Sequence, residues 1–239
     1  MSQATAEQLT PDLMKLLTAV DTPTICNAID LVFGSRTNQG FTHGSFVTAF
    51  PTMKPVLGFA KTGTIRMSTP YTESAEKLRE RRLGWYRHIE AKGVPTIAVV
   101  EDIDDAPGFA AFFGEVHSNV LKGLGVLGAL TNGAVRDIGL LADEFQIIAG
   151  CISPSHAFAQ VVSFGGDVTI KGLPITDGDL LHMDMHGAVI IQGEALRDLP
   201  RAIEVMTARE RPLIDASRRR GFSVEALETA MREADAIKF

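Results

Sequence analysis

The run Val94-Pro95-Thr96-Ile97-Ala98-Val99-Val100 constrains the fold more than any other segment of the chain. Its residues are almost all apolar or β-branched, which is typical of a strand buried on both faces. A helical spacing of apolar residues follows from Glu115 to Leu124, then a short apolar run from Val126 to Leu130, and then a second helical pattern from Asp137 to Phe145 that leads into Phe145-Gln146-Ile147-Ile148. This alternation of strands and helices predicts an α/β fold with parallel strand pairing.

Two helix signals precede this region, at Thr10-Pro11-Asp12 and at Thr22-Pro23. In each, a hydroxyl residue that can cap a helix is followed by proline, whose fixed φ suits the first helical turn. The stretch from Gly34 to Pro55 has no clear period, so we expect a loop with at most one short strand. The alternating segment Val56 to Met67 predicts a strand, and the charged segment Thr72 to Lys92 predicts a helix.

The second half of the chain has a different pattern. Three strand-like segments punctuated by glycines predict a more antiparallel β-region beside the α/β unit; they are Val161 to Ile170, Asp179 to Met185 and Ala188 to Gln192. We expect two C-terminal helices, one over about Leu199 to Ala208 and one that starts at the capping residue Ser223. Because no repeat or long linker divides the chain, we expect a single domain over residues 1–239, with N-terminal helices and a C-terminal helical extension.

Composition excludes several classes of protein. The 23 Lys and Arg against 29 Asp and Glu give a formal charge of −6, which disfavours nucleic acid and anionic membranes as partners. Acids and bases alternate within Thr72 to Lys92, so this helix is expected to be solvated. Cys26 and Cys151 lie in apolar settings typical of buried thiols in a reducing compartment. With neither a secretory signal pattern nor a membrane-length apolar run, the chain is expected to be cytoplasmic.

The segment Gly123-Leu124-Gly125-Val126-Leu127-Gly128 matches the dinucleotide-binding pattern GxGxxG. That fingerprint must follow a strand and open a helix, so that the helix N-terminus faces the pyrophosphate. Here the glycines end a predicted helix and lead into a strand. A helix C-cap with close packing is therefore the favoured interpretation, and a nucleotide-dependent oxidoreductase is a minor alternative.

Two further groups of polar residues have the chemistry of metal ligands. The first group contains His182, Asp184 and His186. These residues occupy alternate positions of a predicted strand, so their side chains share one face, as metal ligands could. Glycine turns on both sides of the strand favour the other interpretation, in which neighbouring groups hydrogen-bond this polar face. The other follows the buried strand at its carboxyl end, where α/β proteins place their ligand clefts; it contains Glu101, Asp102, Asp104 and Asp105. A cation site and a solvated acidic turn are equally open for this second group.

The most informative segment runs from Gly114 to Asp137. Its first helix begins at Gly114-Glu115, so backbone N–H groups there lack helical partners and can bind a carboxylate or enolate. Arg136 and Asp137 are expected just beyond a strand end, at the start of the next helix. If the two helix starts are neighbours, they share one pocket in which arginine grips a carboxylate and an aspartate with waters holds Mg²⁺. A plain surface Arg–Asp pair is the alternative.

Several motifs together resemble the RraA-like family. They are Gly114-Glu115-Val116, the 20 residues between Glu115 and Arg136, Asn132-Gly133-Ala134-Val135-Arg136-Asp137, and Gly178-Asp179-Leu180-Leu181-His182-Met183-Asp184-Met185-His186-Gly187-Ala188-Val189. The family includes regulators of ribonuclease activity and class II 4-hydroxy-4-methyl-2-oxoglutarate/4-carboxy-4-hydroxy-2-oxoadipate aldolases. The resemblance implies a swivelling β/β/α-type α/β domain with a mixed sheet flanked by helices. It also implies a homotrimer or homohexamer with active sites between subunits.

The resemblance also implies roles for individual residues. Arg136 would bind the pyruvoyl part of a small 2-oxo acid, Asp137 would hold Mg²⁺ or Mn²⁺, and Glu115 would position a water for proton transfer. The substrate carboxylate would meet the start of the helix at Gly114, Val116 and His117, through the amides of the last two. The implied activity is a metal-dependent pyruvate aldolase that also decarboxylates oxaloacetate. A non-catalytic regulator that binds a ribonuclease is the alternative.

The chain departs from the family pattern at several positions. Glu115 and Asn132 stand where family members more often have Asp, and the segment Glu73 to Arg87 differs from the common pattern. A neighbouring subunit often supplies carboxylates that steady the metal's waters in this family, and Asp30 and Glu210 are the candidates here. These departures leave the identity of the substrate open.

Overall fold

The computed structural model describes residues 2–239. Its N-terminal part contains a short 3-10 helix (Ala6–Gln8), helix α1 (Pro11–Leu17) and helix α2 (Thr22–Phe33). Thr10 caps α1 by accepting a hydrogen bond from the Leu13 amide, as expected. Helix α2 starts at its predicted place, but Asp21, one residue earlier than Thr22, caps it.

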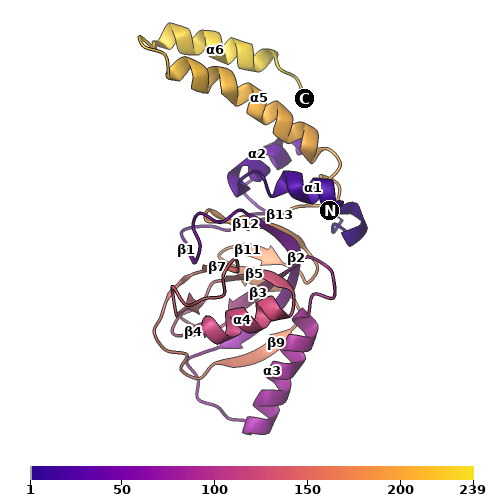
Figure 1. Cartoon of the computed structure of the whole chain (residues 1–239), viewed down its shortest axis with the longest axis vertical. Helices are drawn as coiled ribbons and strands as arrows, with labels where there is room; N and C mark the ends of the chain where they lie inside the picture. The colour runs from indigo at the N-terminus through magenta and orange to yellow at the C-terminus, as the bar shows by residue number, and fades with distance from the viewer. Residues whose placement is uncertain (1) are drawn as a thin grey trace.

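A mixed sheet of eight strands forms the centre of the chain (Figure 1). Its order is β1-β7-β5-β3-β2-β12-β13, and β9 also pairs with β2. The strands are β1 (Val47–Thr48), β2 (Val56–Arg66), β3 (Thr96–Asp102), β5 (Val126–Thr131), β7 (Gln146–Ala149), β9 (Gln160–Phe164), β12 (Leu180–Asp184) and β13 (Gly187–Ile190). Strands β2, β3, β5 and β7 are parallel, whereas β1, β9, β12 and β13 pair antiparallel with their neighbours. The expected α/β class with a mixed sheet flanked by helices is confirmed.

Two smaller sheets complete the β-structure. Strands β10 (Val168–Ile170) and β11 (Leu173–Ile175) form a hairpin, and β4 (Ala111–Phe113), β6 (Ala134–Val135) and β8 (Cys151–Ile152) form a parallel three-stranded sheet. Strands of two or three residues have too little periodicity to be found from the sequence. The three-stranded sheet is the element that positions the candidate site.

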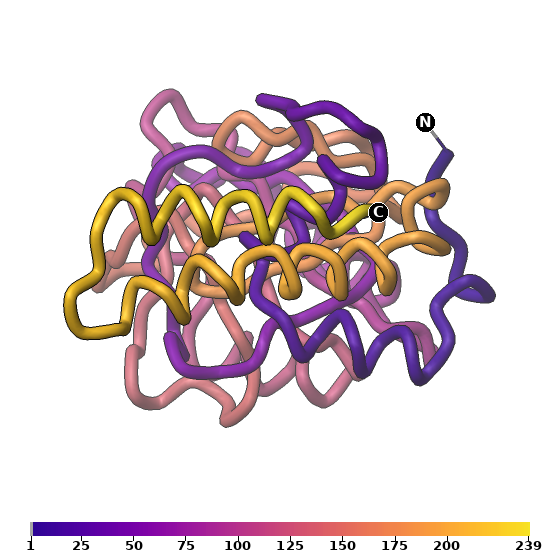
Figure 2. Tube along the Cα trace, turned by 90° about the horizontal axis from the view of Figure 1, so that it is seen from above, coloured from indigo at the N-terminus to yellow at the C-terminus, as the bar shows by residue number. Residues whose placement is uncertain are grey.

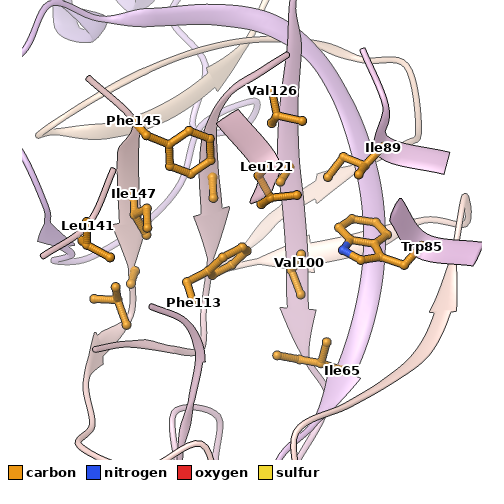
Figure 3. Packing of buried hydrophobic residues seen from close by; sticks show 14 of the residues in the cluster. Ile65, Trp85, Ile89, Val100, Phe113, Leu121, Val126, Leu141, Phe145 and Ile147 are labelled. Atoms are coloured by element: carbon orange, nitrogen blue, oxygen red, sulfur yellow. The ribbon is translucent and has the colours of Figure 1, made fainter. Parts of the chain in front are cut away.

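Helices α3 (Ala75–Ile89) and α4 (Glu115–Gly123) pack beside the parallel strands around a core of large apolar side chains (Figure 3). Phe113 at the end of β4 and Leu121 of α4 are both fully buried in this core. Trp85 of α3 lies close to Gly63 of β2, where an added Cβ would come within 2.8 Å of the indole ring. The core therefore fixes both the strand that precedes α4 and the helix itself.

One expected helix is absent. Residues Asp137 to Phe145 form turns rather than a helix, and three of them have positive φ: Asp137 at 58°, Gly139 at 92° and Glu144 at 53°. A right-handed helix requires negative φ throughout, so these backbone angles break the helical pattern of the apolar residues. The prediction of a helix start at Asp137 is therefore wrong.

The first of the two C-terminal helices is longer than expected, and the second begins where predicted. Helix α5 (Leu199–Ser217) continues through Pro212, and helix α6 (Val224–Ala236) begins after Ser223, whose hydroxyl accepts from the Ala226 amide. The two helices run side by side as a hairpin that extends away from the sheet and joins the rest of the chain mainly through contacts of α5 with α2 (Figures 1 and 2). Within residues 2–239 no single helix is long and apolar enough to cross a membrane; α1 and α2 meet the length and composition only as a pair bent by 112°.

Candidate functional site

The candidate site lies where the short parallel strands β4 and β6 end. Phe113 of β4 pairs with Val135 of β6, so the residues that follow, Gly114 and Arg136, leave the same edge of the small sheet. The Arg136 amide donates to the Phe113 carbonyl over 3.0 Å, which continues the pairing by one more hydrogen bond. The two segments therefore meet because of strand pairing, and not because two helices start side by side as the sequence suggested.

Asp137 lies against the first turn of α4. Its Oδ2 accepts a hydrogen bond of 3.0 Å from the Glu115 amide and lies 3.4 Å from Nε of Arg136. The left-handed backbone of Asp137, which aspartate tolerates better than most residues, turns the carboxylate back toward the helix. The expected convergence of Arg136 and Asp137 on this helix start is thus present in the geometry.

Position 114 requires glycine because a side chain there would clash with its neighbours, and not because of its backbone conformation. Its φ of −160° is ordinary extended backbone. A Cβ at this position would lie 2.6 Å from Oδ2 of Asp137 and 3.0 Å from Cγ of Arg136. The absence of a side chain therefore allows the arginine and the aspartate to approach the helix.

The first turn of α4 keeps two backbone donors available. The Ser118 amide donates to the Gly114 carbonyl, and the Glu115 amide donates to Asp137. The amides of Val116 and His117 have no acceptor among residues 2–239. Val116 is 75% exposed, so solvent or a ligand reaches this end of the helix. Free amides at a helix N-terminus favour an anion.

The His117 side chain anchors this turn. Its ring stacks on Phe113 and makes edge contacts with Phe112 and Tyr86, and Nδ1 donates to the Phe112 carbonyl over 3.1 Å. Burial lowers the pKa of His117 to about 4, so the ring is neutral at pH 7. Its Nε2 is buried without a partner within residues 2–239. The imidazole is thus a packing group, and only the backbone of His117 faces the helix start.

The site is accessible and carries both signs of charge. The side chains of Arg136 and Asp137 are 34% and 30% exposed, and Glu115 is exposed. Within residues 2–239 no cluster of three or more His, Cys, Asp or Glu side chains could enclose a metal ion. Oδ1 of Asp137 has no hydrogen-bond partner in that part of the chain. One open carboxylate oxygen suits Mg²⁺, which usually keeps several waters and takes one or two protein carboxylates.

Large apolar side chains are exposed on the elements that build the site. They come from the loop before β4, from α4, from the turn after Asp137 and from β8, and they are Phe109, Val116, Ile138, Leu140 and Ile152. Exposed apolar side chains that cluster along neighbouring elements are typical of an interaction surface. Of these residues the sequence analysis singled out only Val116, and that for its amide, because an exposed apolar residue has no signature until its neighbours are known.

The group on β12 is structural. His182 is fully buried between helix termini: its Nε2 donates to the Leu17 carbonyl over 3.0 Å, and Nδ1 accepts from the Thr22 hydroxyl over 2.9 Å. Asp184 accepts from the amides of Thr22 and His186, each over 2.8 Å. His186 lies in the turn after β12 and not on the strand, and its Nδ1 pairs with Oδ1 of Asp184 over 3.0 Å. Neighbouring groups thus satisfy the polar side chains, as the favoured interpretation expected.

The acidic group after β3 holds a loop in place. Asp102 accepts from the amides of Asp104 and Gly108, Asp104 accepts from those of Met67 and Ser68, and Glu101 accepts from that of Thr169. Asp102 and Asp104 are buried, whereas Asp105 is exposed. Of the two interpretations left open, the geometry favours a structural turn, although a hydrogen-bonded one rather than a solvated one.

The glycines at positions 123–128 also have a structural explanation. Gly123 is the last residue of α4, Gly125 has a φ of 84°, and Gly128 packs in β5 against the Gln146 carbonyl. Because they join a helix to the following strand, they do not form the helix start that a dinucleotide needs. The candidates for a neighbouring subunit's carboxylates, Asp30 on α2 and Glu210 on α5, lie on elements other than those that form the site.

The curled mixed sheet, with a helix start facing the end of a second small sheet, defines an α/β protein with its candidate site on a sheet edge. The sequence model of the RraA-like family, described as Aldolase/RraA, matches residues 22–190, and the chain belongs to this family. The resemblance drawn from the motifs is thereby confirmed. The match spans the sheet and the candidate site but not the α5–α6 hairpin.

Solved structures share the fold at low sequence identity. One, described as that of novel cellulases from microbes associated with the gut ecosystem, has a TM-score of 0.67 at 18% identity, over 84% of this chain and 86% of that chain. An uncharacterized protein from Pseudomonas syringae pv. tomato has a TM-score of 0.66 at 19% identity, over 92% and 94%. RraAS2 from Streptomyces coelicolor, described as an unusual member of the RNase ES inhibitor RraA protein family, has a TM-score of 0.61 at 18% identity, over 88% and 98%. Comparison with curated protein sequences gives no match.

Proposed function

We propose that the chain is a divalent-metal-dependent lyase that cleaves a 4-hydroxy-2-oxo acid to pyruvate and a second carbonyl compound, and that the same site decarboxylates oxaloacetate. The observation that carries the proposal is the hydrogen bond from the Glu115 amide to Asp137, with Arg136 beside it. An arginine, an open carboxylate oxygen and free helix amides at one point are more than a protein-binding surface requires.

The substrate carboxylate would bind to Arg136 and to the amides of Val116 and His117. A guanidinium pairs with a carboxylate through two parallel hydrogen bonds, and the helix start adds oriented donors. Asp137 is held in place by the Glu115 amide, so its second oxygen keeps a fixed direction. The site would therefore bind and orient the 2-oxo acid before any bond breaks.

Asp137 would hold Mg²⁺ or Mn²⁺, which when bound supplies a Lewis acid for the 2-keto oxygen. Cleavage of the bond between C3 and C4 would leave its electron pair on the pyruvate fragment as an enolate, while the 4-hydroxyl group gives its proton to a water held by Glu115 and becomes the second carbonyl group. The exposed side chain of Glu115 would position the water that gives a proton to C3 of this enolate. Decarboxylation of oxaloacetate leaves the same enolate, because carbon dioxide departs from C3 and its electron pair stays behind.

The exposed apolar side chains around the site support assembly into a trimer or a pair of trimers, with active sites between subunits. A neighbouring subunit would then cover these side chains and could supply the carboxylates that a single chain lacks around Asp137. The two free thiols, Cys26 and Cys151, support a reducing location such as the cytoplasm.

The test follows pyruvate from oxaloacetate and from 4-hydroxy-4-methyl-2-oxoglutarate by a coupled assay, with Mg²⁺ and then with EDTA. We expect EDTA to abolish the activity. Because truncating one partner of a desolvated charge pair costs about 2–5 kcal/mol, Arg136→Ala should lower kcat/KM by about 30-fold to several thousand-fold. Arg197→Ala is the matched control, since the Arg197 side chain is 89% exposed and its ion-pair partner is the neighbouring Asp198.

A loss of less than about threefold for Arg136→Ala would refute the role of this arginine. Absence of metal-dependent pyruvate from either acid would refute the lyase proposal and favour a non-catalytic regulator that binds a ribonuclease.

A further inference from the structure

A second cavity of about 800 Å³ lies apart from the candidate site. It is formed by segments far apart in the sequence: residues 2–3 at the N-terminus, α2, the loop 35–43, the segment 172–179 that contains β11, and β13 with the two residues after it. None of its lining residues belongs to the candidate site. Its size is that of pockets that hold small organic ligands.

The charge of this cavity is negative. Among its lining residues that the structure describes there is no lysine or arginine, whereas Asp30 and Asp179 are both present. Asp179 is occupied: one oxygen accepts from the Gln3 amide group over 3.1 Å and the other from the Thr176 amide over 2.8 Å. Asp30 accepts one long hydrogen bond of 3.3 Å, from the Thr37 amide, to Oδ1. Oδ2 of Asp30 has no donor within residues 2–239, so this carboxylate is open to a ligand.

The neighbouring thiol is influenced by the same charge. Cys26 lies one helical turn before Asp30 on α2 and lines the same cavity. Burial, and after it the negative charge of Asp30, raise the pKa of Cys26 to about 11. The thiol therefore stays protonated, and Asp30 is the charged group on this wall.

A second acceptor in the cavity lacks a partner. Gln192 lines the cavity just beyond β13, and its Oε1 is buried without a hydrogen-bond partner within residues 2–239. A buried carbonyl oxygen without a donor is costly, so such an atom calls for a specific explanation. A ligand N–H or O–H group that enters the cavity would satisfy it.

The remaining walls are apolar and partly aromatic. Three large side chains line the cavity, Phe33 of α2, Phe41 of the following loop and Leu173 of β11, together with Val189 and Ile191. Aromatic faces near a carboxylate favour an organic cation, since the ring quadrupole attracts positive charge and the apolar wall accepts the carbon skeleton. We propose that this cavity binds an amine with an apolar body, whose ammonium group pairs with Asp30 and whose second donor group faces Oε1 of Gln192.

The proposal separates the two sites by charge. The candidate site combines an arginine with free amides and suits an anion, whereas the cavity has an open carboxylate and, among its described lining residues, no basic side chain except His43. The carboxylates of the cavity would repel an oxo acid, so amine binding goes beyond the proposed lyase activity. Asp30 is also a candidate for the carboxylates that a neighbouring subunit would supply to the lyase site, so the two proposals are separated on the unmodified chain, where the probes report on the cavity and the pyruvate assay reports on the lyase.

The test uses the full chain and three probes of one shape: tyramine, which carries an ammonium and a phenol, tyrosol, in which a hydroxyl replaces the ammonium, and 3-(4-hydroxyphenyl)propanoate, which is an anion. Binding is followed by amide chemical shifts at millimolar concentrations. We expect tyramine to shift resonances of α2, the loop 35–43 and β13, and to bind at least about tenfold more tightly than the other two, because tenfold is a modest value for a charge pair of this kind.

Asp30→Asn keeps the shape of the side chain and removes its charge, and we expect it to weaken tyramine binding at least about tenfold. Gln192→Leu should weaken it less. Asp198→Asn is the matched control, because Asp198 lies outside the cavity with its side chain 43% exposed, and its substitution should leave tyramine binding unchanged. Equal binding of the three probes, unchanged binding by Asp30→Asn, or no tyramine-induced shifts in the lining segments would each overturn the proposal. The comparison of probes on the unmodified chain does not depend on how any variant folds.

Discussion

Replacing Gly114 by alanine tests whether the site depends on the close approach of Asp137 to α4. The new Cβ would lie 2.6 Å from Oδ2 of Asp137, and ordinary contact begins at 3.4 Å, so the carboxylate must move by about 0.8 Å or the helix start must shift. Either movement breaks the 3.0 Å hydrogen bond from the Glu115 amide. The φ of −160° at Gly114 suits alanine, so backbone strain adds nothing.

The expected cost has two parts. A hydrogen bond to a charged group contributes about 1.5–3 kcal/mol, and water compensates a large share of it here because Asp137 is 30% exposed. Alanine is also a poorer N-cap than glycine by about 0.5–1 kcal/mol. We therefore expect a loss of about 1–2 kcal/mol, which lowers Tm by a few degrees for a domain of this size. If the proposed lyase activity holds, displacement of a metal-binding carboxylate by nearly 1 Å should lower kcat/KM about 100-fold.

Gly123→Ala is the matched control in the same helix. Nothing lies within 4 Å of a Cβ built at Gly123, and alanine in a helix stabilises by about 0.4–1 kcal/mol relative to glycine. Thermal unfolding by calorimetry and the coupled pyruvate assay, run on both variants and the unmodified chain, supply the measurements. A Gly114→Ala protein as stable and as active as the Gly123→Ala protein would refute the argument that Asp137 needs this space.

Two further predictions concern stability. Burial lowers the pKa of His117 to about 4 and that of His182 below its usual value, so the folded chain binds fewer protons than the unfolded chain in acid. The stability that depends on these neutral rings is therefore fully present above pH 6.5 and is lost as pH falls toward 4. His117 accounts for up to about 3 kcal/mol of this loss. His117→Phe should reduce this loss in urea titrations at pH 7 and pH 5, and an unchanged difference would contradict the assignment. Asp104→Ala leaves two backbone donors without their acceptor, including the buried Met67 amide, and should cost about 1–3 kcal/mol in the same titration. Asp105→Ala, at an exposed neighbour, should cost almost nothing, and equal losses for the two variants would show that the acidic turn is not held by Asp104.

The sequence predicts the long strands and most helices because their patterns repeat over enough residues. The apolar run at 94–100 becomes the buried strand β3, and the caps at Thr10 and Ser223 open helices as expected. Helix α5 is underestimated because Pro212 normally ends a helix, whereas here it is accommodated within one. These outcomes follow from local interactions, which a sequence pattern records directly.

The residues of the candidate site could be predicted from the sequence, but the secondary-structure elements that bring them together could not. The spacing of Glu115, Arg136 and Asp137 suggested two adjacent helix starts, yet the second helix does not form and strand pairing between β4 and β6 supplies the proximity. Apolar spacing after Asp137 resembled a helix, although Ile138 and Leu140 are exposed in turns. The amine cavity could not be predicted at all, because five segments distant in sequence enclose it.

The brevity of β4 and β6 has a consequence for the resilience of the site. A few backbone hydrogen bonds and the burial of Phe113 and Val135 hold these two strands together. Many more backbone hydrogen bonds must break before the eight-stranded sheet unfolds. Proteins open in cooperative units of unequal free energy, and a three-stranded patch of this size belongs with the weaker units. Amides in this three-stranded sheet should then exchange through local opening, faster than global unfolding allows. Mild heating or a low concentration of denaturant should therefore disrupt the candidate site while circular dichroism still reports a folded protein.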